Sequence, residues 1–181
     1  RWAEKFMAKN QKYTVAVQGG GSGTGATALI NRNCDIAQMS RAMKESEQAN
    51  LKSATGKEAR EHIVAYDGVA VVVHPGNPVD QLTEQQLARI FRGEASNWNE
   101  FGGPDSSIVV LARDTSSGTH VFVKEHIVWE RGAENEAEYG PKVQFLTSNQ
   151  AIYTEVKQNP QAIGYIGLGY LDGAVKALAV K

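Results

Sequence analysis

Cysteine is nearly absent from this sequence. Cys34 is the only one in 181 residues, so no internal disulfide can form. Its apolar context, Cys34-Asp35-Ile36-Ala37, predicts a buried small hydrophobe rather than a nucleophile. The four histidines are His62, His74, His120 and His126. None stands at metal-ligand spacing from another, so we expect no metal and no cofactor.

Excess charge and long apolar runs are also missing. The formal net charge is -1, so no overall basic field favours nucleic acid as a partner. No apolar run approaches the ~20 residues of a membrane span. The chain opens at Arg1 without a signal segment, and we expect a processed or trimmed product. The length fits one ordinary domain or two small lobes.

A glycine-rich turn, Gly19 to Gly25, follows an alternating segment at 13–17 that predicts a strand. No Lys-Ser/Thr pair follows its last glycine, which excludes the nucleotide P-loop, and the dinucleotide pattern lacks a clearly placed ribose-binding acid. Glycines let backbone N–H groups approach an anion, here at Gly23, and Ser22 adds a hydroxyl donor. The alternative is a tight turn without a ligand.

A second candidate is Ser40-Arg41, at the end of a predicted strand over 35–39. Ligands of open α/β sheets bind at carboxyl ends of strands, although Arg41 could equally be a solvated loop residue. Asp67 interrupts a long apolar strand prediction over 66–73. An acid there needs a partner, so Asp67 is either a structural hydrogen-bonding group or a site residue.

The third candidate is the stretch 113–119, Arg-Asp-Thr-Ser-Ser-Gly-Thr, after a predicted buried strand over 108–112. Ser117 can cap the following helix, and the first amides of a helix lack intrahelical partners. Arg113 can reach the same spot with its forked guanidinium, which suits a tetrahedral oxyanion. Asp114 either orients Arg113 or caps the turn. The alternative is an ordinary cap beside a surface arginine.

Other segments complete an α/β pattern. Thr83 and Gln86 predict a capping box before a helix that ends at Gly93, and 162–167 and 175–180 predict strands. The three candidate turns lie in two strand–helix blocks. We therefore expect lobe I at 1–70 plus 165–181, lobe II at 71–164, and a cleft between them.

These motifs together resemble the substrate-binding proteins of bacterial phosphate ABC importers, which have the type II periplasmic binding protein fold. The matching stretches, in the family's order, are 18–25, 35–41, 66–73, 82–93 with Asn97-Trp98, 102–105, 113–119 and 162–165. The resemblance implies a two-lobe α/β fold with mixed sheets and helices on both faces. It also implies that family members have a strand and an anion-binding turn before Trp2, and continue past Lys181. We expect both segments to be lacking here, either lost or supplied by another chain.

The resemblance also implies a phosphate site. Ser22 would bind through its hydroxyl and N–H, Arg113 would form the main charge-assisted contact, and Ser117, Gly118 and Thr119 would donate from the second lobe. Ser40-Arg41 stands where other members have an aspartate in the arginine's place, which accepts the proton of phosphate. Asp67 is our candidate to replace that acceptor. The expected set is Ser22, Gly23, Ser40, Arg41, Asp67, Arg113, Ser117, Gly118 and Thr119.

The implied function is transport rather than catalysis. The protein would bind inorganic phosphate and deliver it to the membrane permease of an ABC importer, in the periplasm or anchored at the cell surface. A sensor domain, or a binder of sulfate or molybdate, is the alternative on the same fold. No Ser-His-Asp arrangement can be placed, so we expect no enzyme.

Overall fold

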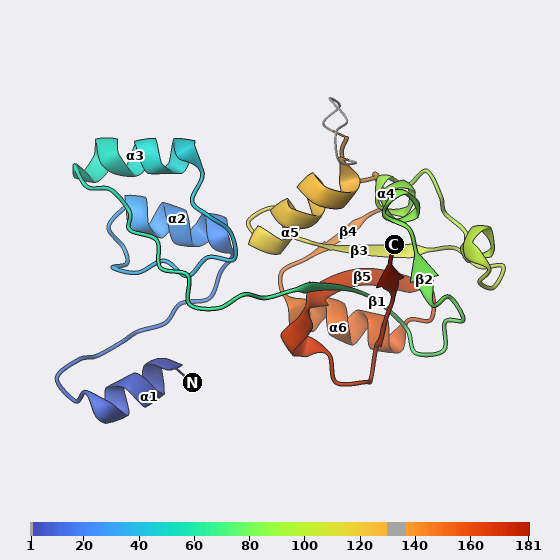
Figure 1. Cartoon of the computed structure of the whole chain (residues 1–181), viewed down its shortest axis with the longest axis horizontal. Coiled ribbons are helices and arrows are strands. Elements are labelled where there is room, and N and C mark those ends of the chain that lie inside the picture. Colours follow the sequence, from blue (N-terminus) through green and yellow to red (C-terminus); the bar gives the residue numbers. More distant parts are fainter. Residues whose placement is uncertain (1, 130–136) are drawn as a thin grey trace.

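The computed structural model describes residues 2–129 and 137–181, which form two regions of different architecture (Figure 1). Residues 2–68 form a helical region with long connecting loops, and residues from 69 onward form a sheet region. The chain passes from one to the other along the extended stretch that leads into strand β1.

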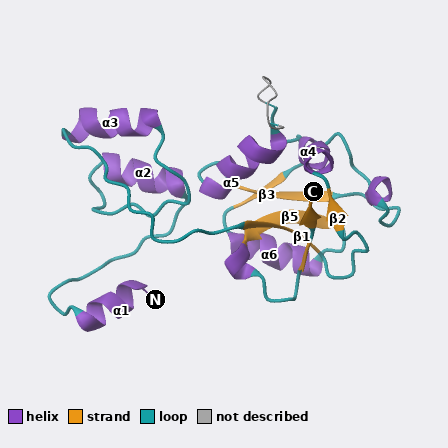
Figure 2. Cartoon of the chain, viewed as in Figure 1, coloured by secondary structure: helices purple, strands orange, loops and turns teal. Residues whose placement is uncertain are grey.

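The elements are interleaved along the chain (Figure 2). The helices are α1 Trp2–Lys9, α2 Ser22–Ile30, α3 Glu45–Thr55, α4 Glu84–Arg92, α5 Gly118–Val123 and α6 Asn149–Gln158. Short helical turns are η1 Trp98–Phe101, the π-helical η2 Lys124–Val128 and η3 Leu168–Tyr170. The strands are β1 Val69–Val73, β2 Gln81–Leu82, β3 Val109–Arg113, β4 Gln144–Leu146, β5 Ala162–Gly167, β6 Lys176–Ala177 and β7 Ala179–Val180.

The main sheet has five strands in the order β4-β3-β5-β1-β6. β3 is parallel to β4 and β5, whereas β1 is antiparallel to β5 and β6. β2 and β7 form a separate parallel pair. The expected mixed α/β architecture is therefore confirmed.

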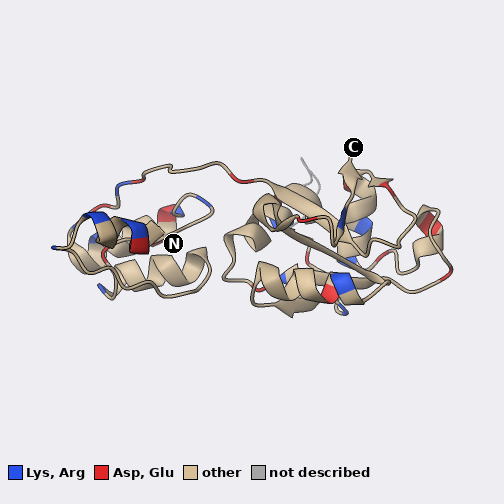
Figure 3. Cartoon of the chain, turned by 90° about the horizontal axis from the view of Figure 1, so that it is seen from below, with Lys and Arg blue, Asp and Glu red and all other residues tan. Residues whose placement is uncertain are grey.

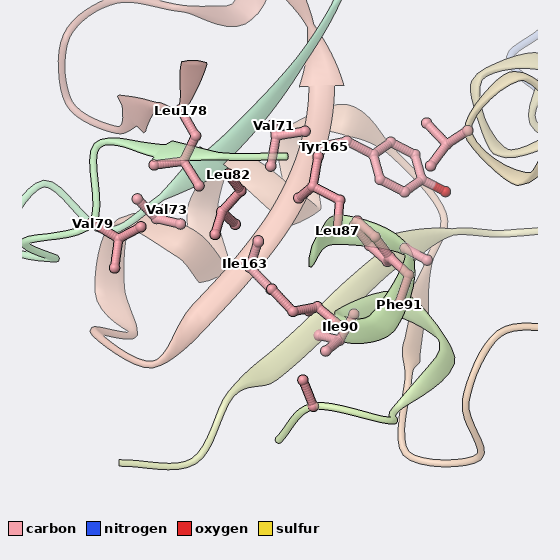
Figure 4. Packing of buried hydrophobic residues seen from close by; sticks show 14 of the residues in the cluster. Val71, Val73, Val79, Leu82, Leu87, Ile90, Phe91, Ile163, Tyr165 and Leu178 are labelled. Carbon is pink, nitrogen blue, oxygen red and sulfur yellow. The ribbon is translucent and has the colours of Figure 1, made fainter. Parts of the chain in front are cut away.

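One face of the main sheet packs against α4 (Figure 4). Val71 and Val73 of β1 share a buried cluster with Leu87, Ile90 and Phe91 of α4. Each fully buried large aliphatic or aromatic side chain contributes about 1.5–3 kcal/mol relative to an exposed one. This cluster therefore fixes the sheet beneath the helix.

The opposite face packs against α6. Ala70 and Val72 alternate with the α4-facing residues of β1 and lie with Ile152 and Val156 of α6. A Cβ atom on Gly164 of β5 would lie only 2.6 Å from Cγ2 of Ile152. The glycine thus allows α6 to approach the sheet closely, and helices cover both faces as expected.

Helix α4 begins and ends where its sequence predicts. The Thr83 hydroxyl accepts the Gln86 amide at 3.1 Å, and Oε1 of Gln86 accepts the Thr83 amide at 2.8 Å. These two bonds satisfy amides that have no intrahelical partner. Gly93 ends the helix in the left-handed region, with φ of 76°.

The helical region contains no strand among residues 2–68. The strands predicted over 13–17 and 35–39 are therefore wrong for this structure. A strand is defined by hydrogen-bonded pairing with another strand, and neither segment forms such a pairing here. Tyr13, Val17 and Ile36 remain exposed in consequence.

The segment from Tyr165 to the end lies in the sheet region. Residues 162–167 pair with β1, β6 also pairs with β1, and β7 pairs with β2. We expected 165–181 to belong to lobe I together with 1–70. In the structure, antiparallel hydrogen bonds instead join this segment to β1 in the sheet region. The expected division into lobes remains a prediction.

Candidate functional site

The first and third predicted anion turns meet across the two regions. Gly23, in the first turn of α2, donates its amide hydrogen to the carbonyl of Ser116 at 3.0 Å. In Figure 1 the starts of α2 and α5 face each other at this contact. Two turns more than 90 positions apart in the sequence therefore form one local structure.

Glycines permit this close approach. A Cβ atom on Gly21 would lie 2.2 Å from the carbonyl oxygen of Ser116. A Cβ atom on Gly118 would lie 2.1 Å from Oγ of Ser40 and 2.5 Å from Oγ of Ser22. The contact consequently brings Ser40, from the second predicted turn, to the same place.

Three serine hydroxyls lie near the meeting point. Ser22 is buried, and its Oγ accepts the Ser40 amide at 3.0 Å and lies 3.3 Å from the Ser40 Oγ. Ser117 is also buried and caps α5 by accepting the His120 amide at 3.4 Å. Thr119 is half-buried beside Gly118. A hydroxyl that accepts an amide hydrogen still has its own hydrogen to donate, so Ser22 and Ser117 remain potential donors.

Arg113 supplies a buried positive charge at the end of β3, with 8% of its surface exposed. Its Nη2 donates to the Thr147 carbonyl at 3.1 Å and lies 3.6 Å from Oδ2 of Asp114. Its buried Nε has no hydrogen-bond partner among the described residues. A buried charged group with an unused donor is a strong candidate to bind an anion.

Asp114 orders the turn beside this arginine. Its Oδ1 accepts the Ser116 amide at 3.0 Å and also the Ser116 hydroxyl. Burial alone would raise the pKa of Asp114, but the hydrogen bonds from Ser116 and the nearby positive charge of Arg113 lower it overall. The carboxylate therefore stays ionised and both caps the turn and faces Arg113.

The guanidinium of Arg41 is bound by Glu47, an acid that the sequence analysis did not predict at the site. Its Nη1 and Nη2 donate to the two carboxylate oxygens of Glu47 on α3, at 2.9 and 2.8 Å. The hydrogen bond to Glu47 raises the pKa of Arg41, and the same bond lowers the pKa of Glu47. Arg41 follows Ser40 directly. Both of its Nη atoms are occupied, but its buried Nε has no hydrogen-bond partner among the described residues, and its role as a ligand remains a prediction.

Asp67 is exposed and lies beside Gly68 and Gly167. Its Oδ1 accepts the amide of Gly68 at 2.9 Å, and a Cβ atom on Gly167 would lie 2.9 Å from its Oδ2. In the described structure, Arg41 and Arg113 have Glu47 and Asp114 as their acidic neighbours instead. The role of Asp67 as acceptor remains a prediction.

Charge is distributed evenly outside the site. Figure 3 shows basic and acidic residues interspersed on both regions. Attraction of an anion therefore depends on local donors.

Among residues 2–129 and 137–181, no three His, Cys, Asp or Glu side chains are grouped to hold a metal ion. No helix within those ranges combines the length and apolarity required to cross a bilayer.

A cavity of about 690 Å³ lies elsewhere, at the start of α4. Among the described residues that line it, Asp80 and Glu100 are the acids and Lys181 is the only cation. This charge balance is unfavourable for an anion, so the contact between the two regions is the better candidate site.

The mixed sheet, its covering helices and the contact between two regions define an α/β protein of the binding-protein type. The chain belongs to the PBP superfamily, because the PBP superfamily domain matches residues 1–179. The relatives and solved structures to which the chain is similar have names that refer to phosphate binding or phosphate transport.

The phosphate-binding protein PstS of Bacillus subtilis is 33% identical over 180 residues, which cover 98% of this chain and 56% of that protein. A phosphate ABC transporter substrate-binding protein from Clostridium perfringens, solved with bound phosphate, is 33% identical with a TM-score of 0.84. The match covers 98% of this chain and 68% of that one. An ABC-type phosphate transport receptor from Vibrio cholerae is 35% identical with a TM-score of 0.72, covering 98% and 69%. The chain spans little more than half of the B. subtilis protein.

Proposed function

We propose that this chain binds inorganic phosphate where the helical and sheet regions meet, and delivers it to the membrane permease of an ABC importer. The observation behind this proposal is the buried guanidinium of Arg113, with its unpartnered Nε, beside two Ser/Gly turns in direct contact. Hydroxyls of Ser22 and Ser117 and the amides of Gly118 and Thr119 add donors of the kind that surround a tetrahedral oxyanion.

The chemistry of these groups supports binding without turnover. Arg113 neutralises charge, serines and amides donate hydrogen bonds, and nothing in this set is a base-activated nucleophile. The proteins of similar sequence and structure are described as phosphate-binding or phosphate-transport proteins. The site of action that follows is outside the cytoplasmic membrane, either in the periplasm or anchored at the cell surface.

Calorimetric titration of the 181-residue chain with phosphate, and then with sulfate, tests the proposal. We expect saturable binding of phosphate and weaker binding of sulfate. Thermal unfolding gives an independent measurement, because phosphate at 100 times its Kd stabilises the folded state by about 2.7 kcal/mol. Absence of both heat and stabilisation at millimolar phosphate would reject phosphate as the ligand of this chain.

Asp67→Asn tests our prediction for the acceptor that distinguishes phosphate from sulfate. A carboxylate accepts the O–H of monohydrogen phosphate but repels sulfate, which has no hydrogen. We expect the variant to bind phosphate more weakly and to lose preference over sulfate. Asp114→Asn is the matched comparison, since Asp114 is the acid that lies beside Arg113. Unchanged selectivity in Asp67→Asn would exclude Asp67 as the acceptor.

A further inference from the structure

We propose that Tyr165 and His120 are positioning residues that hold the backbone amide and carbonyl of Arg113 and so aim its guanidinium at the site. The two side chains come from different elements and contact neither Ser22 nor Ser40 in the described hydrogen bonds. The inference rests on the proposed function only where phosphate affinity is the readout.

The geometry of the sheet leaves Arg113 without a strand partner on one side. β3 and β5 pair only at Val109 with Ala162 and at Val110 with Ile163. On the other side, the amide of Asp114 donates to the Leu146 carbonyl of β4. Because successive backbone groups of a strand alternate in direction, the amide and carbonyl of Arg113 face the side that β5 has left.

Tyr165 satisfies the first of these groups. Its hydroxyl oxygen accepts the Arg113 amide hydrogen at 2.9 Å, across 52 positions of sequence. Tyr165 has 0% exposure, and Figure 4 shows its ring extending from β5 beside Leu87 and Phe91 of α4. The phenol therefore replaces a missing ladder bond at the end of β3.

His120 satisfies the second group. Its ring Nδ1 lies 2.8 Å from the Arg113 carbonyl oxygen, and since a carbonyl can only accept, Nδ1 carries the hydrogen. The amide of the same residue donates to the Ser117 hydroxyl. His120 thus links the end of β3 to the first turn of α5, where Gly118 and Thr119 lie.

The two positioning side chains support each other through Tyr139. The hydroxyls of Tyr139 and Tyr165 are 3.3 Å apart, and the rings of His120 and Tyr139 have centroids 5.0 Å apart. Burial raises the pKa of Tyr165, so the phenol remains protonated and available for this pair. Arg113 is consequently oriented before any anion arrives, which reduces the ordering cost of binding.

Tyr165→Phe removes the hydroxyl and keeps the ring, and His120→Leu removes the Nδ1 donor. We expect each variant to bind phosphate about tenfold more weakly, the scale of one lost buried hydrogen bond. His120→Asn should restore affinity to within about threefold of the parent, because the asparagine amide places a donor near the Nδ1 position. Ile163→Val is the control: it lies on the same strand and in the same buried cluster as Tyr165 but has no bond to Arg113.

A second readout separates this inference from the proposed function. Hydrogen exchange of the Arg113 amide, measured by NMR without phosphate, should accelerate at least tenfold more in Tyr165→Phe than in Ile163→Val. If the parent binds no phosphate, the proposed function fails while this exchange difference still supports positioning. Parent-like exchange of the Arg113 amide in Tyr165→Phe would overturn the inference, as would parent-like phosphate affinity in both Tyr165→Phe and His120→Leu when the parent binds.

Discussion

Arg113 combines a buried charge with an unpartnered donor, and this combination predicts a large effect of substitution. We expect Arg113→Ala to weaken phosphate binding by roughly 2–5 kcal/mol, the range for losing one partner of a buried charge-assisted contact. Arg113→Lys should also lose affinity, because a point charge cannot reproduce the planar fork. Calorimetric titration of the three proteins provides the measurement.

Arg89→Ala is the matched control for that series. Arg89 lies on the same region of the chain and forms an ion pair with Glu100 at 3.0 Å, but nearly half of its side chain is exposed. Arg89→Ala changes the net charge by the same amount as Arg113→Ala. It should leave phosphate affinity within about twofold of the parent, as expected for screened surface charges. Equal losses in Arg89→Ala and Arg113→Ala would show that only overall charge matters.

His120 predicts a pH dependence of stability. Burial lowers the pKa of His120 below the ~6.5 of an unfolded histidine, so between the two values the unfolded chain binds more protons than the folded one. The contribution is complete above about pH 6.5 and is lost as the pH falls toward the folded value. We expect the urea midpoint of the parent to fall more steeply from pH 7.5 to 5.5 than that of His120→Asn. Parallel pH profiles would contradict this assignment.

At the scale of elements, α4 depends on a cap that can be tested directly. Thr83→Ala removes the hydroxyl that accepts the Gln86 amide, and we expect a loss of about 1 kcal/mol in the free energy of unfolding. Thr83→Ser keeps the acceptor and should lose only a few tenths of that value. Urea unfolding measures both variants, and equal stability of parent and Thr83→Ala would show that the cap contributes nothing.

The strands show which elements depend on more than local pattern. β1 and β3 appear where apolar runs predict them, because both faces of this sheet are covered and each strand has neighbours. The segments 13–17 and 35–39 have similar strand patterns but pair with no other strand in residues 2–68. Alternation of side chains indicates which residues could share a face, but only pairing makes a strand.

At the scale of the whole molecule, Gly118 tests whether ligand binding requires the two regions to touch. A methyl group on Gly118 would meet Ser40 and Ser22 at 2.1 and 2.5 Å, so Gly118→Ala should force the regions apart. We expect the parent to become more compact with saturating phosphate in small-angle scattering, because only contact brings both donor sets to one anion. Gly118→Ala should show no compaction and at least tenfold weaker binding.

Gly169→Ala is the control for this experiment, since no atom lies within 4 Å of a Cβ placed there. It should behave as the parent does in scattering and in calorimetry. Compaction of Gly118→Ala equal to that of the parent would show that phosphate does not act by closing this contact.

The sequence by itself determined the elements and groups whose cause is local. The Thr83 cap, the end of α4 at Gly93 and the Ser117 cap all depend on neighbours within a few residues. Hydroxyls, glycines and an arginine in short turns also indicated anion chemistry, because donor type and backbone freedom are properties of the residues themselves.

Only the tertiary structure decided which of these groups meet. It placed Gly23 against Ser116, bound the guanidinium of Arg41 to Glu47, and brought the Tyr165 hydroxyl to the amide of Arg113. It also left Asp67 exposed, with its carboxylate bound to the amide of Gly68. These outcomes depend on strand pairing and on distances through space between segments far apart in the chain, which no local pattern of side chains specifies.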